Sequence, residues 1–241
     1  TTNDGVTTLT STISTFSISG NLFINAEDNG AFENDAIFSL STGTVTVAGT
    51  VVLDSDTDDN DADATFTMDL GTDNGTLVLT GATPFSLTGM GGELLDFDGL
   101  TGGNTTTVNY NGGSQTVQPS TYRNLVLSGS GTKTLTGVAD INRNLTLSGT
   151  VTAATATNFN LDGNLSIGDG TSMTVAGFNF IVLGTTTIDG TLTSNSTTGT
   201  KTFDNIVISV TGEFNSTVDE NYTLTGSLDV NAAATLTSGS G

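Results

Sequence analysis

A six-residue motif returns at regular intervals along the C-terminal half of this chain, and it restricts the fold more than any other feature. The motif reads Asn-Leu-x-Leu-Ser-Gly at Asn124–Gly129 and Asn144–Gly149, and Asn164–Gly168 is a shortened copy. Weaker copies fill the same two apolar slots with Thr186/Ile188, Ile206/Ile208 and Leu228/Val230. Whole units that recur every ~20 to 22 residues are typical of the coils of a solenoid.

Each repeat carries two further apolar patches, in which hydrophobic residues alternate with Thr, Ser, Asn or Asp. This alternation indicates half-buried strands. Three short strands in each coil predict a parallel β-helix, right-handed because parallel crossovers almost always are. A β-sandwich with hairpin turns also spaces its strands in this way, but here the motif recurs at coil intervals too. We therefore predict an all-β, right-handed parallel β-helix (solenoid) with three short strands per coil for residues 108–241.

The first 107 residues are less regular. Apolar pairs at Leu22/Ile24, Val45/Val47, Phe66/Met68 and Phe85/Leu87 are spaced at about 19 to 23 residues and predict four further coils. The sequence between these pairs is more acidic and irregular, so a capping β subdomain is the alternative. Solenoids need such caps because their ends are otherwise open sheet edges. We predict an N-terminal β region over residues 1–107, as a cap or as irregular coils, and a regular solenoid over residues 108–241.

The charge of the chain limits its partners. Its 241 residues include 25 acidic and 4 basic residues, a formal net charge of -21. Nucleic acid and anionic lipid are therefore not expected as partners, because binding a polyanion requires a basic surface. No stretch approaches the roughly 20 apolar residues that span a bilayer, so we expect no membrane insertion. No signal-peptide pattern opens the sequence, and we expect any secretion signal to have been removed already.

The most specific local pattern is an acidic run between Asp54 and Asp63. Alternating carboxylates allow neighbouring loop residues to converge on one hard cation, as calcium sites require. The spacing is not that of an EF-hand, because Asp59 replaces the glycine and Thr65 the closing glutamate. The alternatives are a generic calcium loop and a solvated acidic turn. The candidate ligands are Asp54, Asp56, Asp58, Asp61 and Asp63.

The sequence argues against an enzyme. Histidine is absent, which removes the usual general base, and tryptophan is absent as well. Glu93, Asp96 and Asp98 could form an acid–base pair, but the basic residues needed to hold a sugar are scarce. Only four exist, namely Arg123, Lys133, Arg143 and Lys201.

For the lysines and the threonine pairs, we expect ordinary structural positions and no special function. We expect Lys133 and Lys201 to be exposed, since lysine is rarely buried, and an intramolecular isopeptide bond would require a buried lysine beside an acid. Threonine pairs such as Thr155/Thr157 and Thr191/Thr193 lie at different offsets in the coil, which favours ordinary strand threonine over an ice-binding face.

One stretch resembles a known family. Residues 108–117 read Val-Asn-Tyr-Asn-Gly-Gly-Ser-Gln-Thr-Val, residues 121–129 read Thr-Tyr-Arg-Asn-Leu-Val-Leu-Ser-Gly, and residues 130–135 read Ser-Gly-Thr-Lys-Thr-Leu. This text is similar to the repeat unit of the large secreted β-strand-repeat surface proteins of Bacteroidota, which are themselves similar to filamentous adhesins. The resemblance implies an extracellular or cell-surface location and a filament role, and it carries no catalytic residues.

We therefore expect a structural subunit of a cell-surface filament or matrix that assembles end to end with copies of itself by β-strand pairing. The segment Thr7–Ser19 is a long uncharged strand-former, and Ala232–Gly241 offers no charged cap. The alternative is a cell-surface adhesin that binds a surface glycan or a host surface with the help of calcium.

Overall fold

The computed structural model describes residues 5–12, 14–26, 34–55, 63–68, 74–89, 94–97, 105–138 and 140–239. Within these ranges every regular element is a β-strand and no helix occurs, so no candidate membrane-spanning helix is found there. The chain divides into two compact units, Thr1–Val108 and Asn109–Gly241. The prediction of an all-β protein built from parallel sheets, as in a parallel β-helix or solenoid, is confirmed.

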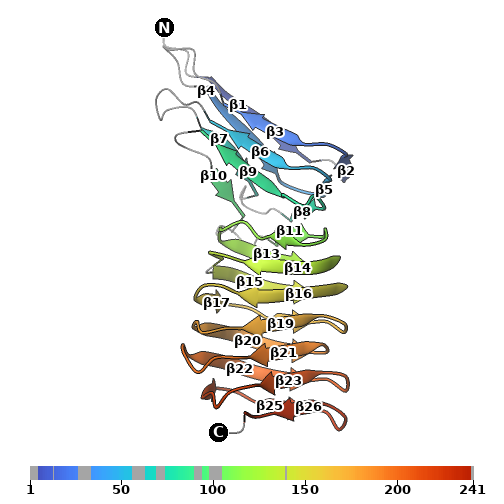
Figure 1. The fold of residues 1–241 in the computed structure, drawn as a ribbon. Helices are drawn as coiled ribbons and strands as arrows, with labels where there is room; N and C mark the ends of the chain where they lie inside the picture. The colour runs from blue at the N-terminus through green and yellow to red at the C-terminus, as the bar shows by residue number, and fades with distance from the viewer. Residues whose placement is uncertain are drawn as a thin grey trace. The chain divides into compact units, whose positions relative to one another are not determined.

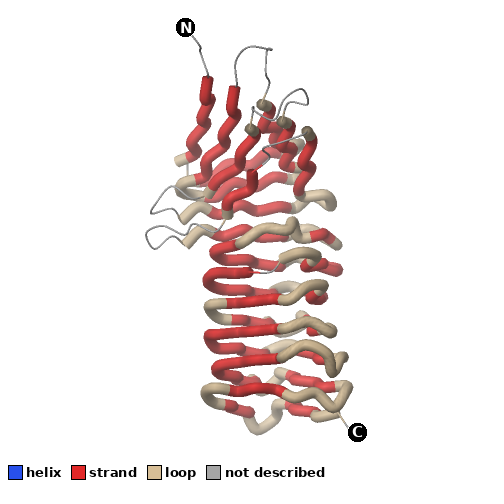
Figure 2. Tube along the Cα trace, turned by 90° about the vertical axis from the view of Figure 1, so that its left-hand side faces the viewer, coloured by secondary structure: helices blue, strands red, loops and turns tan. Residues whose placement is uncertain are grey.

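Unit 2 contains two parallel sheets, whose strands follow one another as successive rungs (Figures 1 and 2). The first sheet comprises β13 (Tyr122–Leu127), β15 (Asp140–Leu147), β17 (Phe159–Leu161), β18 (Leu165–Ile167), β20 (Phe180–Ile188), β22 (Lys201–Ile208), β24 (Tyr222–Leu224) and β25 (Leu228–Val230). The second sheet comprises β12 (Gln115–Thr116), β14 (Ser130–Leu135), β16 (Thr150–Thr155), β19 (Ser172–Val175), β21 (Thr191–Ser194), β23 (Glu213–Ser216) and β26 (Thr235–Thr237). The boundary between the two units falls within β11 (Thr107–Tyr110).

The repeated sequence motif sets the strand register of unit 2. Each residue in the first apolar slot pairs with its counterpart one coil later, in the order Leu125, Leu145, Leu165, Thr186, Ile206 and Leu228. The second slot stacks equally, in the order Leu127, Leu147, Ile167, Ile188, Ile208 and Val230. All of these side chains before the last coil are buried. Since stacked coils bury what a single coil cannot, these columns form the core.

The asparagine of the motif forms a ladder beside the core. The Asn144 side-chain carbonyl accepts a hydrogen bond from the Asn164 backbone N–H at 3.0 Å, and Asn164 accepts one from Thr185 at 2.9 Å. Partners in this ladder are 20 and 21 residues apart, one coil each. Asn205 continues the pattern by accepting from the Ser227 N–H at 2.9 Å. At this corner of each coil, an asparagine side-chain carbonyl thus accepts the hydrogen bond of a backbone N–H group in the next coil.

The glycine that ends the motif is required by both conformation and space. Gly149 has φ +76°, and a Cβ there would lie 2.4 Å from the carbonyl oxygen of Gly129 in the preceding coil. Gly129 itself has φ +77°. Only glycine adopts this conformation without strain and allows so close an approach of two backbones.

Unit 1 contains three parallel sheets with longer coils. Their strands are β1 (Gly5–Ser11), β4 (Asn34–Leu40), β7 (Ala64–Thr67) and β10 (Leu94–Asp96); β2 (Thr15–Ile18), β5 (Thr44–Val47) and β8 (Thr76–Leu79); and β3 (Leu22–Asn25), β6 (Val51–Asp54) and β9 (Phe85–Thr88). Hydrogen bonds between adjacent coils here join residues 28 to 35 apart.

This arrangement corrects the four coils predicted from the apolar pairs of the first hundred residues. Leu22/Ile24 pairs with Val51/Leu53 and then with Phe85/Leu87, whereas Val45/Val47 and Phe66/Met68 belong to the two other sheets. The prediction treated strands from different sides of a coil as equivalent. The apolar spacing alone did not distinguish one long coil with three strands from successive short coils.

A charge in the stacked column should unfold unit 2. We expect Leu145→Asp to lower the free energy of unfolding by at least about 3–5 kcal/mol, because it leaves an unpaired charge in the core. Thr152→Asp is the matched control, since Thr152 is exposed on β16, and its effect should stay within about 0.5 kcal/mol. Urea denaturation followed by circular dichroism measures both; equal effects would contradict the assigned register.

Candidate functional site

In the last described coil of unit 2, the side chains of the core columns have no described coil beyond them. The side chains that continue the buried columns are exposed here: Leu224 by 37%, Leu228 by 46%, Val230 by 40% and Leu236 by 50%. The sequence predicted Leu228 in the same inward column as Leu125 and Leu145, and the pairing places it there, but no further described coil covers it. Within the described residues the solenoid therefore ends on an apolar surface.

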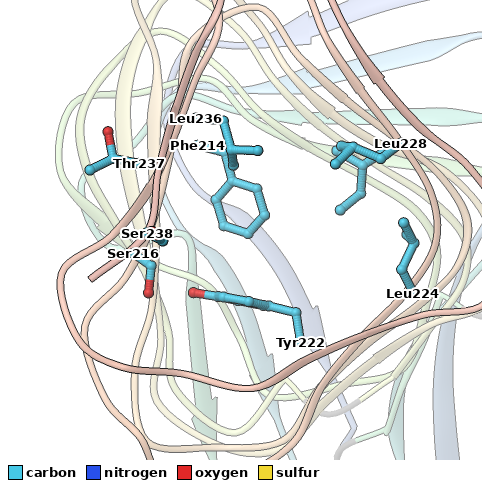
Figure 3. A pocket seen from close by; sticks show the side chains of 9 residues that line it. Phe214, Ser216, Tyr222, Leu224, Leu228, Leu236, Thr237 and Ser238 are labelled. Atoms are coloured by element: carbon cyan, nitrogen blue, oxygen red, sulfur yellow. The ribbon is translucent and has the colours of Figure 1, made fainter. Parts of the chain in front are cut away.

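A cavity of about 290 Å³ opens at this end. Figure 3 shows Leu224 and Leu228 on one wall, with Phe214 and Leu236 facing them and the ring of Tyr222 below. The lining is otherwise apolar, and its side-chain hydroxyl groups belong to Ser216, Tyr222, Thr237 and Ser238. The hydroxyl of Tyr222 is buried and has no hydrogen-bond partner in the described structure. We refer to this cavity with β24, β25 and β26 as the open end.

The backbone at the open end is unpaired on one side. Among the described strands, β24 and β25 pair only with β22, and β26 pairs only with β23. The other edge of these three strands carries backbone N–H and C=O groups. In every earlier coil of unit 2, the same edge pairs with the parallel strand of the next coil. Such an edge is a template for another strand.

Unit 1 begins with a second exposed edge. Leu9 on β1 is 63% exposed and Phe23 on β3 is 67% exposed, and both line a groove of about 320 Å³. The segment Thr7–Ser19, predicted as one long strand available to a neighbouring molecule, forms β1 and β2, which pair with β4 and β5 of the same chain. What remains available is the outer edge of β1, β2 and β3, rather than a free strand.

The candidate calcium ligands lie only partly within the described residues. Asp56, Asp58 and Asp61 fall outside them. The carboxylate of Asp54 accepts a hydrogen bond from the Thr88 hydroxyl at 2.6 Å, and that of Asp35 accepts one from the Asp63 backbone N–H at 3.1 Å. No group of three or more acidic, histidine or cysteine side chains that could hold a metal is found among the described residues. The calcium loop stays a prediction.

The acid–base pair considered from the sequence lies mostly outside the described residues. Glu93 and Asp98 lie outside the described residues. Asp96 lies on β10, where its carboxylate accepts a hydrogen bond from the hydroxyl of Thr67 at 3.4 Å.

Both lysines are buried, contrary to the expectation that they would be exposed. Lys133 is 0% exposed and Lys201 is 1% exposed. The register explains why: Lys133 occupies the inward slot that Ala153 and Met173 fill in later coils, and Lys201 occupies the slot of Phe180. Aligning the coils by the motif places Lys133 opposite the inward Ala153. The slot of Lys201 also depends on a one-residue register shift between Val182 and Thr185, which the motif does not show.

The Lys133 ammonium group is satisfied by three oxygen acceptors. It donates to the carbonyls of Gly112 and Gly113 at 2.9 and 2.6 Å and to the side-chain carbonyl of Gln115 at 2.6 Å. Gln115 is the register partner of Lys133 on β12. The Lys133 ammonium group therefore stabilises, through these hydrogen bonds, the turn at Gly112 and Gly113 that precedes the second sheet. Burial lowers the pKa of Lys133 to about 8.

Lys201 has a carboxylate as its partner. Its Nζ lies 3.4 Å from the Glu220 Oε2, and the two side chains are 1% and 3% exposed. Nζ also donates to the carbonyl of Thr198 at 2.8 Å. A lysine beside a buried acid is the arrangement that the sequence could not identify, because Glu220 lies in the turn between β23 and β24, outside the repeated motif.

The outer face of the second sheet carries a short stack of hydroxyl side chains. Thr191 and Thr193 stack on Ser172 and Thr174 of the preceding coil, and Ser172 stacks on Thr152, with 3.3 Å between their hydroxyl oxygens. Thr155 is buried, and the segment Thr185–Thr187 lies on the other sheet, so the pairs quoted from the sequence do occupy different positions.

Comparison with known proteins found no match for this chain among family models, curated proteins or solved structures.

The pKa of Lys133 predicts a stability that rises with pH. Because its folded pKa is below the usual 10.4 or so, the unfolded chain binds more protons between pH 8 and 10, and raising pH in this window favours the folded state. Melting temperature should increase from pH 8 to 9.5 in the wild type, and Lys133→Met should flatten that increase. The window ends there because burial raises the pKa of Tyr110 and Tyr122 above 10, which reverses the trend. The same slope in both proteins would contradict this role.

Calcium, if it binds, should stabilise unit 1 through the acidic run. A ligand that binds only the folded state raises the melting temperature by mass action. We expect a higher melting temperature in ~1 mM calcium than in chelator, because free calcium well above its Kd stabilises the folded state. The difference should disappear when Asp56 and Asp58 are changed to Asn. Calorimetry measures it, with equimolar magnesium as the control for screening. An identical melting temperature in calcium and chelator would leave the solvated acidic turn as the explanation.

Proposed function

We propose that this protein is a non-enzymatic, extracellular structural subunit of a cell-surface filament or matrix, in which copies associate end to end by β-strand pairing. The open end of unit 2 is the observation that carries this proposal. It combines four exposed core residues with an unpaired parallel edge. Within this proposal the coil is right-handed, with three short strands per circuit, so that a neighbour continues the same rise and pleat.

The proposed occupant of the open end is the first coil of a second copy. That coil offers its own unpaired edge of parallel strands and its own exposed apolar residues, Leu9 and Phe23. A contact between two different surfaces is heterologous, and it propagates into a filament unless the geometry closes a ring. Stacked coils lie about 4.8 Å apart, so the contact would resemble one more internal step of the solenoid.

Charge favours a cation-rich setting for this assembly. The chain carries a formal net charge of -21, so copies repel one another at low ionic strength. Salt reduces this repulsion, since the screening length falls to about 8 Å at physiological ionic strength. Apolar contact at the open end then exceeds the remaining repulsion.

The test changes the open end alone. Leu228→Asp with Val230→Asp should raise the protein concentration needed for assembly by about a hundredfold, because burying each side chain is worth about 1.5–3 kcal/mol. Thr223→Asp is the matched control, since Thr223 is exposed on β24 between the inward positions of Tyr222 and Leu224. Analytical ultracentrifugation and negative-stain electron microscopy follow assembly of the full chain.

The proposal requires filaments for the wild type and the control but monomers for the double variant. Wild-type protein that stays monomeric at high concentration and physiological salt would overturn it. Filaments that survive in the double variant would show that another surface mediates assembly, which also contradicts the role of the open end.

A further inference from the structure

We propose that Lys201 and Glu220 join in an intramolecular isopeptide bond, which links β22 covalently to the turn before β24. The two groups meet one coil below the open end. Lys201 begins β22, and Glu220 lies between β23 and β24. Their charged atoms are 3.4 Å apart, and neither side chain is more than 3% exposed.

The column that holds Lys201 is aromatic on both sides of it. In its column Lys201 lies between Phe180 and Tyr222. The ring centroids of Phe180 and Phe203 are 5.8 Å apart, and those of Phe214 and Tyr222 are 5.2 Å apart. Separated charges are costly in such a medium, because the loss of hydration of both ions can exceed their mutual attraction. An amide removes both charges and keeps a hydrogen-bonding carbonyl and N–H.

The bond forms by loss of one water molecule. A proton passes from the Lys201 ammonium to the Glu220 carboxylate, which gives a neutral amine and a carboxylic acid. The Nζ lone pair then attacks Cδ, and the Nζ–Cδ bond forms. The hydroxyl oxygen leaves Cδ with a proton from Nζ, as water. Atoms and charges balance without any oxidant, reductant or other co-reactant.

The fold supplies the positioning that this step needs. The carbonyl of Thr198 accepts a hydrogen bond from Nζ at 2.8 Å and holds it beside the acid. On the other side, the hydroxyl of Ser194 donates to the Glu220 Oε2 at 3.4 Å, where negative charge develops during attack. Groups held in this way react with effective concentrations of about 10⁵ M or more.

Lys133 provides an internal comparison. It is equally buried, but its side-chain partner is the carboxamide of Gln115 and its other two acceptors are backbone carbonyls. No carboxylic acid is among the acceptors described for it. We therefore assign the bond to Lys201 and not to Lys133.

The experiment is the intact mass of the purified, denatured full chain. The expected mass is lower than that of the sequence by one water, and tandem mass spectrometry of a digest should find the peptides of Lys201 and Glu220 joined. A wild-type chain with the full sequence mass, after prolonged incubation under folding conditions, would overturn the proposal. This measurement needs no variant, so it is independent of any folding defect.

Variants then assign the atoms. Lys201→Arg and Glu220→Ala should keep the full mass of their sequences, whereas Lys133→Arg should still lose one water. Glu220→Gln should lose ammonia in place of water and give the same cross-link. Ser194→Ala should slow the loss of water by about tenfold or more. A loss of water that persists in Lys201→Arg would contradict the assignment even if the wild type shows it.

Discussion

Backbone hydrogen bonding in parallel register, from each coil to the next, is the constraint on which the rest of unit 2 depends. Because Leu125 pairs with Leu145 and Leu145 with Leu165, every slot of a coil meets the same slot of its neighbours. A residue's environment is then set by its slot. Apolar slots form columns, the corner asparagine becomes a ladder, and the motif's final glycine packs against the glycine one coil earlier. Since each coil contacts only its neighbours, stability accumulates coil by coil.

The same constraint places two lysine side chains inside a protein of strongly negative charge. Lys133 and Lys201 occupy slots that are apolar elsewhere, and each is satisfied by acceptors from its own or an adjacent coil. Buried charges persist only with such partners. Both lysines thus act within the coil stack, and they leave the net charge of the outer surface even more negative than the composition suggests.

The sequence predicts unit 2 well because its repeat is short and its slots are explicit. It identifies the fold class, the inward column and the step between coils from Asn124–Gly129 and its copies. It fails where information lies outside the repeat. In unit 1 the coils are longer, and the apolar spacing assigns Val45 and Leu22 to equivalent positions although they lie in different sheets. Residue type predicts an exposed Lys133, whereas the repeat register places it inside. The inward slot of Lys201 follows from a one-residue register shift that the motif does not show. The motif places Leu228 in the inward column, whereas its exposure is seen only in the structure, where β25 pairs with β22 and with no later described strand.

The positions of the four basic residues determine where trypsin-like proteases can cleave the chain. Proteases that cleave after lysine or arginine have only Arg123, Lys133, Arg143 and Lys201 as targets in the whole sequence. These residues lie within β13, β14, β15 and β22, and none lies in a loop. A protease must bind its substrate as an extended, accessible segment, so cleavage requires that a coil first separate from both neighbours. Trypsin-like enzymes should therefore cleave folded unit 2 slowly, and unit 1 contains no lysine or arginine.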